Sequence, residues 1–331
     1  MGAIPKVSVL MPAFNAEKHI ALAIDSILAQ SFQDYEFIII NDGSTDNTEQ
    51  IIGSYNDARI RYIKNETNLK LIATLNKGFD LCLGQYIVRM DADDISLPDR
   101  IEKQVQFMDK NPEIGLCGTA FESFGFINGP YFYKSEDIDI RIRLLHECHM
   151  LHPSIIIRTE VIRQHNLYMT ILHGEDLDFF IRIAEQTKLA NLPEILIRYQ
   201  QLPESMSKAN AEITELHCTK IHLGLFKKIH PNFSEDEVRL YRAVAYKDFK
   251  SIQNRLSEVF NILKKLLEGN AQRHILDQQA FNNYLKELWI QIILNVKGFN
   301  FNFYRRSSDL NKTLAINSLI QGKAIIKHYL K

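Results

Sequence analysis

Short apolar runs alternate with amphipathic segments along the first hundred residues of the chain. An uninterrupted apolar run is typical of a buried strand, whereas apolar positions repeating at the helical period are typical of one face of a helix. The pattern predicts strands over residues 7–11 (ended by Pro12), 37–40, 60–63 and 86–90. Helices are predicted between them, the first capped by Asn15, the second beginning near residue 47 and the third covering residues 69–83.

The pattern is less regular farther along the chain. It predicts strands over residues 115–121, 152–158 and 189–199, and helices over residues 100–110, over 138–146 and from residue 175. The aromatic, glycine-rich residues 122–135 are expected to form a hairpin or a covering loop. From about residue 204 onward the pattern is helical. We therefore predict an α/β domain over residues 1–205, with a mostly parallel, Rossmann-like sheet flanked by helices, and an α-helical domain over residues 206–331.

Polar clusters follow three of the predicted strands, at residues 12–15, 41–44 and 91–94. In open α/β sheets, ligands bind beyond the carboxyl ends of the strands. Because all three clusters would lie at one edge of the sheet, the sequence predicts a binding pocket there.

The third cluster is the most informative, because Asp91, Asp93 and Asp94 directly follow an apolar strand. Carboxylates crowded at such a position repel one another unless a cation lies among them, and Mg²⁺ and Mn²⁺ prefer oxygen ligands. The alternative is a capped turn before Pro98. Both alternatives stay open from the residues alone, and Asp94 fits the capped turn best.

Charge is distributed unevenly along the chain of 331 residues, although the net charge is only −1. Residues 1–205 contain 19 basic and 29 acidic side chains, whereas residues 206–331 contain 20 basic and 11 acidic ones. An acidic first domain is consistent with a cation site. The basic remainder indicates either an anionic partner, such as a membrane surface, or simply a solvated helical face.

Several classes of protein are excluded by the motifs. The four cysteines form no CxxC pair, which argues against a disulfide framework or a zinc site. No apolar run approaches a membrane span, and we expect no secretory leader, so a cytoplasmic location is predicted. There is no GxGxxG or P-loop motif, and Ser96 and Pro98 interrupt the EF-hand-like spacing after Asp91.

Together these clusters resemble the family 2 glycosyltransferases, which are inverting enzymes of GT-A fold. The resemblance covers about residues 5–200 and consists of motifs that occur in the family's order. These are the segments at residues 9–15, 41–46 and 75–78, the Asp-X-Asp motif of residues 91–93, and the pair Glu175 and Asp176.

The resemblance implies that residues 1–110 bind a nucleotide sugar and residues 111–205 face the acceptor. Pro12, Ala13 and Phe14 would line the base and ribose, and Asp42 would accept a hydrogen bond from the base, which for uracil is its imide N–H. Asp91 would face the ribose or the metal. The further candidates for nucleotide-sugar binding, taken from the same motifs, are Asn15, Asn76 and Ala92.

The remaining implied roles concern the reaction. Asp93 would ligate Mg²⁺ or Mn²⁺ at the diphosphate, which helps the leaving group to depart. Asp176 would be the general base that takes the proton of the acceptor hydroxyl, and Glu175 would position hydroxyl groups of donor or acceptor.

Two positions depart from the family pattern. Lys70 stands where glycine is frequent, and is either a donor to the uracil or phosphates or an exposed lysine at a helix start. After the last predicted strand, residues 198–201 lack the histidine that often lies near the metal. His152 and His173 are alternatives, so the remaining protein ligand stays unassigned.

We therefore predict a metal-dependent hexosyl- or N-acetylhexosaminyltransferase that moves a sugar from an NDP-sugar, most simply a UDP-sugar, to a glycan or lipid-linked acceptor of a surface polysaccharide. The alternatives are a nucleotidyltransferase and a non-catalytic sugar-nucleotide-binding or scaffold protein. No nucleic-acid partner is expected. The basic, aromatic residues 297–331 suit peripheral contact with the inner face of the membrane, packing on the catalytic domain, or a homodimer contact.

Overall fold

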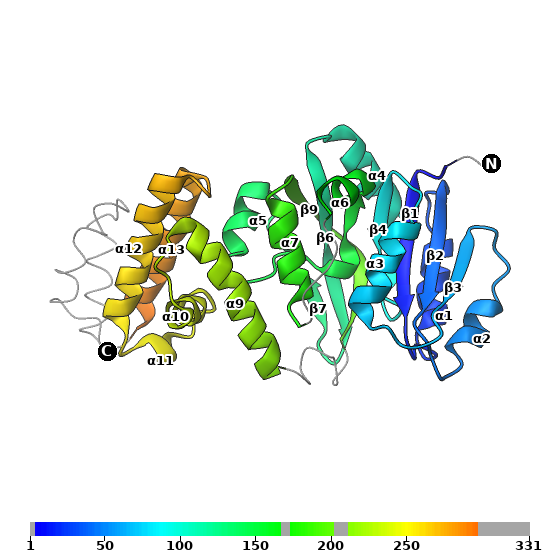
Figure 1. Cartoon of the computed structure of the whole chain (residues 1–331), viewed down its shortest axis with the longest axis horizontal. Coiled ribbons are helices and arrows are strands. Elements are labelled where there is room, and N and C mark those ends of the chain that lie inside the picture. The colour runs from blue at the N-terminus through cyan, green and yellow to red at the C-terminus, as the bar shows by residue number, and fades with distance from the viewer. Residues whose placement is uncertain (1–3, 167–172, 202–210, 297–331) are drawn as a thin grey trace. The chain divides into compact units, whose positions relative to one another are not determined.

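The structure is a computed structural model that describes residues 4–166, 173–201 and 211–296 (Figure 1). Two compact units are distinguished. The first comprises the described residues up to Ile140 and those between Cys148 and Thr214, and the second comprises Arg141–Glu147 and the described residues from Glu215 onward. The boundary predicted at residue 205 lies outside the described residues, and so does the predicted membrane or dimer segment 297–331.

The first unit is built on one nine-stranded sheet with the order β3-β2-β1-β4-β8-β6-β9-β5, to which β7 adds by pairing with β6. The strands are β1 (Val7–Ala13), β2 (Tyr35–Asn41), β3 (Ile60–Lys64), β4 (Tyr86–Arg89), β5 (Ile95–Ser96), β6 (Ile114–Gly125), β7 (Gly129–Tyr131), β8 (Ile156–Arg158) and β9 (Lys188–Gln201). Strands β1 to β4 run parallel to one another, whereas β8 is antiparallel to both β4 and β6. The predicted α/β fold is confirmed, with a parallel first half and a mixed second half.

Helices connect these strands, and all except the helix at Thr159–His165 lie where the sequence predicts a helix. They are α1 (Ile20–Leu28), α2 (Thr48–Gly53), α3 (Leu71–Leu81), α4 (Arg100–Lys110), α5 (Asp137–Arg143), α6 (Thr159–His165) and α7 (Glu175–Ala184). The segment predicted as one strand over residues 152–158 is divided into a 3₁₀ turn, η1 (His152–Ser154), and the short β8. Pro153 lies inside this turn, where its fixed φ is tolerated.

The first strand is longer than predicted, because Pro12 does not end it. Leu10 accepts a backbone hydrogen bond from Met90 after β4, and Ala13 accepts one from Asp42 after β2. Alternate residues of a strand bond to opposite neighbours, so the nitrogen of Pro12 faces the side of β4. Pairing with β4 ends at Leu10, and the missing N–H of Pro12 therefore costs no ladder hydrogen bond.

The prediction that Asn15 caps the first helix is wrong. The residue that precedes α1 is His19, and Asn15 instead has a left-handed backbone with φ 48°. Its backbone N–H donates to Ser44 Oγ (3.0 Å), and its side-chain oxygen accepts from the backbone N–H of Thr45 (2.9 Å). Asn15 thus joins the loop after β1 to the loop after β2.

The second unit is helical over its described residues, as predicted. Its helices are α9 (Ala211–Ile229), most of which lies in this unit, α10 (Glu235–Ala245), α11 (Phe249–Ile252), α12 (Leu256–Arg273) and α13 (Gln278–Asn295). Trp289, Phe281 and Phe226 are fully buried in its core. Ile142 and Leu145, from the segment between β7 and η1, are buried in the same core.

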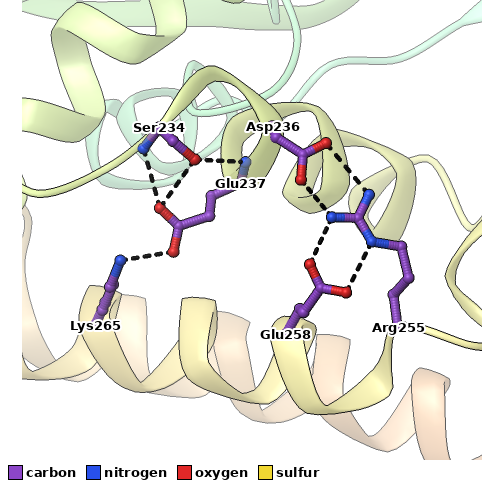
Figure 2. Close-up of polar contacts among 6 residues, drawn as sticks. All are labelled: Ser234, Asp236, Glu237, Arg255, Glu258 and Lys265. Atoms are coloured by element: carbon purple, nitrogen blue, oxygen red, sulfur yellow. Dashed lines mark hydrogen bonds and ion pairs between the residues drawn. The ribbon is translucent and has the colours of Figure 1, made fainter.

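A polar network fixes the start of α10 against α12 (Figure 2). Ser234 and Glu237 form a reciprocal capping box, in which each side chain accepts from the other's backbone N–H. Glu237 also binds Lys265 Nζ (2.6 Å), and Arg255 lies between Asp236 and Glu258. Exposed ion pairs contribute little individually, so the capping box is the stronger local stabiliser.

We expect Ser234→Ala to lower the free energy of unfolding by about 1 kcal/mol, because one backbone N–H at the helix start loses its acceptor. Ser257, which is exposed on α12, provides the matched control. The same substitution there should be neutral or slightly stabilising, because alanine has a higher helix propensity than serine and Ser257 is not the capping residue. Urea unfolding of both variants measures the difference, and equal stabilities would contradict the assignment.

Candidate active site

Three carboxylates gather immediately after β4. One oxygen from each of Asp91, Asp93 and Asp94 lies within 4.8 Å of the others. Asp94 is fully buried, and its Oδ1 accepts a hydrogen bond from the backbone N–H of Gln200 on β9 (2.8 Å), while Oδ2 has no partner among the described residues. Asp94 therefore belongs to the cluster and is held by β9, whereas the sequence suggested that it only caps a turn.

Mutual repulsion and burial disfavour the charged forms of these carboxylates. Burial, followed by the charge of Asp91, raises the pKa of Asp93 to about 6. The pKa of Asp94 is raised for the same reasons. Burial and the neighbouring negative charges thus both disfavour ionisation here, and a bound cation would offset both effects.

Arg89, the last residue of β4, connects this cluster to the rest of the site. Its side chain is only 3% exposed, and its Nη1 lies 2.5 Å from Asp91 Oδ2. The charge of Arg89 also acts on Asp176, from the start of α7. One buried guanidinium thus interacts with both the carboxylate cluster and the predicted base.

A second buried guanidinium, that of Arg100, holds the backbone on both sides of the site. Its Nη2 donates to the carbonyl oxygens of Arg89 and Pro153, at 2.8 Å in each case. Gln104, one helical turn along α4, accepts from Arg100 Nε and donates to the carbonyl of Ser154. Helix α4 therefore fixes the end of β4 relative to η1.

Asp176 lies in the first turn of α7, which the chain enters through Gly174 at φ 123°. His152 Nδ1 is 2.9 Å from Asp176 Oδ1, although the two groups are not aligned for a well-formed hydrogen bond. Partial loss of hydration raises the pKa of Asp176, but the nearby His152 and Arg89 outweigh this effect and hold that pKa below its ordinary value. Glu175 Oε2 accepts from the backbone N–H of Gly174 (3.0 Å), at the start of the same helix.

Asp42 and Lys70 meet at a neighbouring strand end, but not through the contacts that the sequence suggested. Asp42 is buried, and its carboxylate accepts from Asn65 Nδ2 and from the backbone N–H groups of Leu69 and Lys70. Lys70 has φ 74° and precedes α3. Asp42 thus organises residues 65–70, and its role toward a base stays a prediction, as does that of the Lys70 side chain.

The other predicted binding residues are found at the same strand ends or on α3. Ala13 and Ala92 are buried, Phe14 is 47% exposed, and Asn76 is half-buried on α3. Phe14 is therefore the apolar side chain best able to stack on a ligand. Their assignment, like that of Pro12 and Asn15, stays a prediction.

Sequence analysis assigned no role to Arg89, Arg100 or Gln104. Arg89 could have been noticed in the sequence, because it is a charged residue at the end of an otherwise apolar run. It also lies two positions before the first carboxylate of the cluster. The spacing of Arg100 and Gln104 on α4 reveals their shared face, but nothing local reveals the backbone carbonyls that they bind.

The α/β fold and the strand-end carboxylates are features expected of a glycosyltransferase, and comparison with known proteins gives the family. Residues 8–165 match the sequence profile described as "Glycosyl transferase family 2". An uncharacterized glycosyltransferase of Haemophilus influenzae is 39% identical over 236 residues, which cover 69% of this chain and 93% of that protein. The chain belongs to glycosyl transferase family 2, and it is a glycosyltransferase.

Other similar proteins carry more specific descriptions. The O-antigen biosynthesis glycosyltransferase WbnJ of Escherichia coli is 29% identical over 237 residues, covering 69% of this chain and 92% of that protein. The fold is similar to that of S. aureus TarS 1–349 in complex with UDP-GlcNAc (TM-score 0.60, 18% identity, covering 96% of this chain and 92% of the other). It is also similar to the mannosyltransferase PcManGT of Pyrobaculum calidifontis in complex with GDP-Man and Mn²⁺ (TM-score 0.52, 12% identity, covering 99% and 85%).

We expect Asp93→Asn to stabilise the metal-free protein at pH 7, by at most about 3 kcal/mol. A carboxyl group whose folded-state pKa is raised binds more protons when folded, so the wild type loses stability as the pH rises from about 4 to about 6. The variant lacks this loss. Thermal unfolding from pH 4 to pH 8 without metal measures the effect.

The same variant should lose stabilisation by metal. MnCl₂ should raise the melting temperature of the wild type at pH 7 and much less at pH 4, because only ionised carboxylates bind the cation. Asp34→Asn, which changes an exposed carboxylate outside the cluster, is the control and should behave as the wild type. An equal Mn²⁺ response in Asp93→Asn would contradict the assignment of Asp93.

Proposed function

We propose that this glycosyltransferase is an inverting, metal-dependent enzyme that transfers a sugar from a UDP-sugar to a glycan or lipid-linked acceptor during surface polysaccharide synthesis. The observation that carries the proposal is the joining of two acidic sites by Arg89. One is the cluster of Asp91, Asp93 and Asp94, and the other is Asp176.

The donor set suits a hard divalent cation. Asp93 and Asp91 would hold Mn²⁺ or Mg²⁺, and Asp94 offers a buried oxygen, Oδ2, that has no partner among the described residues. The bound cation would supply charge neutralisation for the diphosphate leaving group. The fold similarity to a mannosyltransferase in complex with Mn²⁺ supports this part of the proposal.

Asp176 is suited to act as the general base. Its side chain is 43% exposed, so an acceptor hydroxyl can approach it, and its lowered pKa keeps it ionised at neutral pH. It would accept the hydroxyl proton as that oxygen attacks the anomeric carbon on the face opposite the leaving diphosphate. Glu175, the neighbouring carboxylate, would position hydroxyl groups.

The proposed classes of donor and acceptor are inferred from similar proteins. The TarS complex with UDP-GlcNAc supports a UDP-sugar, and a role of WbnJ in O-antigen biosynthesis supports an acceptor among surface glycans. We place the enzyme in the cytoplasm at the inner face of the membrane, where lipid-linked acceptors are found. No helix among the described residues is long and apolar enough to cross a membrane.

We expect Asp176→Asn to lower turnover at least about a hundredfold while leaving donor affinity nearly unchanged, because the amide cannot accept the proton but fills the same space. A panel of NDP-sugars with Mn²⁺ identifies the donor from the release of nucleoside diphosphate. Calorimetric titration with UDP and Mn²⁺ then measures nucleotide affinity in the variant.

Asp178→Asn is the matched control on the same helix. Asp178 pairs with Arg182 along α7, so this variant should keep turnover within about twofold of the wild type, as expected for loss of a helical ion pair. Wild-type turnover in Asp176→Asn would refute the assignment of the base. Nucleotide binding without turnover, across the whole donor panel and with varied glycan acceptors, would instead support the non-catalytic alternative.

A further inference from the structure

His152 is a buried histidine that nothing described so far requires. Its side chain is 2% exposed, and it is part of η1, which is a different element from the loop that carries the carboxylate cluster. The ring makes edge contacts with Phe179 and Phe180, at centroid distances of 5.9 and 6.0 Å. Its Nδ1 faces Asp176 Oδ1 at 2.9 Å.

We propose that His152 is the positioning residue of Asp176: it engages one carboxylate oxygen and thereby orients the other toward the acceptor hydroxyl. The proposal rests on the function of Asp176 as base. A carboxylate on the first turn of a helix can rotate about its side-chain bonds, and a general base is effective only within hydrogen-bond reach of the proton that it takes. An imidazole fixed on a different element removes that freedom.

The backbone that carries His152 is well anchored. The carbonyl of Pro153 accepts from Arg100, and that of Ser154 accepts from Gln104. The hydroxyl of Ser154 donates to the carbonyl of Leu151 (2.7 Å). His152 is therefore held by α4, while the aromatic rings of Phe179 and Phe180 set the plane of its imidazole from α7.

The electrostatic effect of His152 on Asp176 supports the same role as its position. Among the described residues, the titratable groups that act on Asp176 are His152 from η1 and Arg89 from β4, and Arg89 is itself paired with Asp91. On α7 itself, the neighbouring Glu175 is directed to the backbone of Gly174. His152 and Arg89 both lower the pKa of Asp176, so removing His152 should raise that pKa.

Three substitutions of His152 separate its effect on the orientation of Asp176 from its effect on the pKa of Asp176. His152→Asn keeps an amide N–H near the position of Nδ1, His152→Gln moves it toward the position of Nε2, and His152→Ala removes it. All three remove the imidazole that lowers the pKa of Asp176, so the acid limb of the kcat–pH profile should move to higher pH in each. The plateau of kcat should fall about tenfold or more in the alanine and glutamine variants, part of the 10²–10⁴ that a placed base contributes, with the donor KM little changed. The asparagine variant should stay within about threefold of the wild type.

The activity readout is UDP release from the donor that the panel selects, and a second readout needs no turnover. Carboxyl ¹³C titration of aspartate-labelled protein, with Asp176 assigned from Asp176→Asn, should show the higher pKa in all three variants. His149→Asn is the control, because His149 is a buried histidine whose Nε2 accepts from the backbone N–H of Lys134. It should change thermal stability without moving the pH profile.

The outcomes distinguish this proposal from the proposed function. If Asp176→Asn is inactive while all three His152 variants keep the wild-type plateau and acid limb, the positioning role is refuted and the base assignment stands. Equal losses of the plateau in the asparagine and glutamine variants, with wild-type unfolding temperatures, would also refute positioning through Nδ1. If Asp176→Asn is fully active, the base assignment itself fails.

Discussion

The burial of two guanidinium groups at the end of β4 is the constraint on which the rest of the site depends. Arg89 and Arg100 are 3% and 0% exposed, and a buried charge without partners would cost several kcal/mol. Arg100 meets this requirement with the carbonyl oxygens of Arg89 and Pro153, and Arg89 meets it with Asp91. Because these partners lie on β4, η1 and the loop after β4, satisfying the two charges also fixes the relative positions of the segments that carry the chemistry.

The two guanidinium groups do not neutralise the negative charge of the site on their own. Among the described residues, the carboxylates of Asp91, Asp93, Asp94 and Asp176 outnumber the two buried guanidinium groups near them, so a negative excess remains when all four are ionised. This excess lies at the cluster, where the pKa values rise, and not at Asp176, where the pKa falls. One sheet edge thus provides both an environment that favours cation binding and a carboxylate that stays ionised as a base. The loss of folding stability that comes from ionised, crowded carboxylates is confined to the cluster. Such a loss is common at functional sites.

Much of this arrangement could be predicted from the sequence, because apolar runs reveal buried strands and the topology brings their carboxyl ends to one edge. The extension of β1 through Pro12 could not be predicted, since it depends on where pairing with β4 ends. Asparagine is a residue type that often caps helices, but hydrogen bonds with Ser44 and Thr45 determine the conformation of Asn15. The place of Asp94 depends on a backbone N–H more than a hundred residues away, that of Gln200. In each case a partner distant in sequence overrides a local preference.

Three of the acidic residues at the site share one further feature, which connects fold to chemistry. A fixed group of the protein lies against one carboxylate oxygen of each: Arg89 for Asp91, the backbone N–H of Gln200 for Asp94, and the imidazole of His152 for Asp176. A carboxylate held by one oxygen presents the other in a defined direction, so little reorganisation is needed when a ligand arrives. Asp42 differs, because three protein donors occupy both of its oxygens. Its contribution to donor binding would therefore come chiefly through the loop of residues 65–70 that it holds in place, and only secondarily through its remaining lone pair.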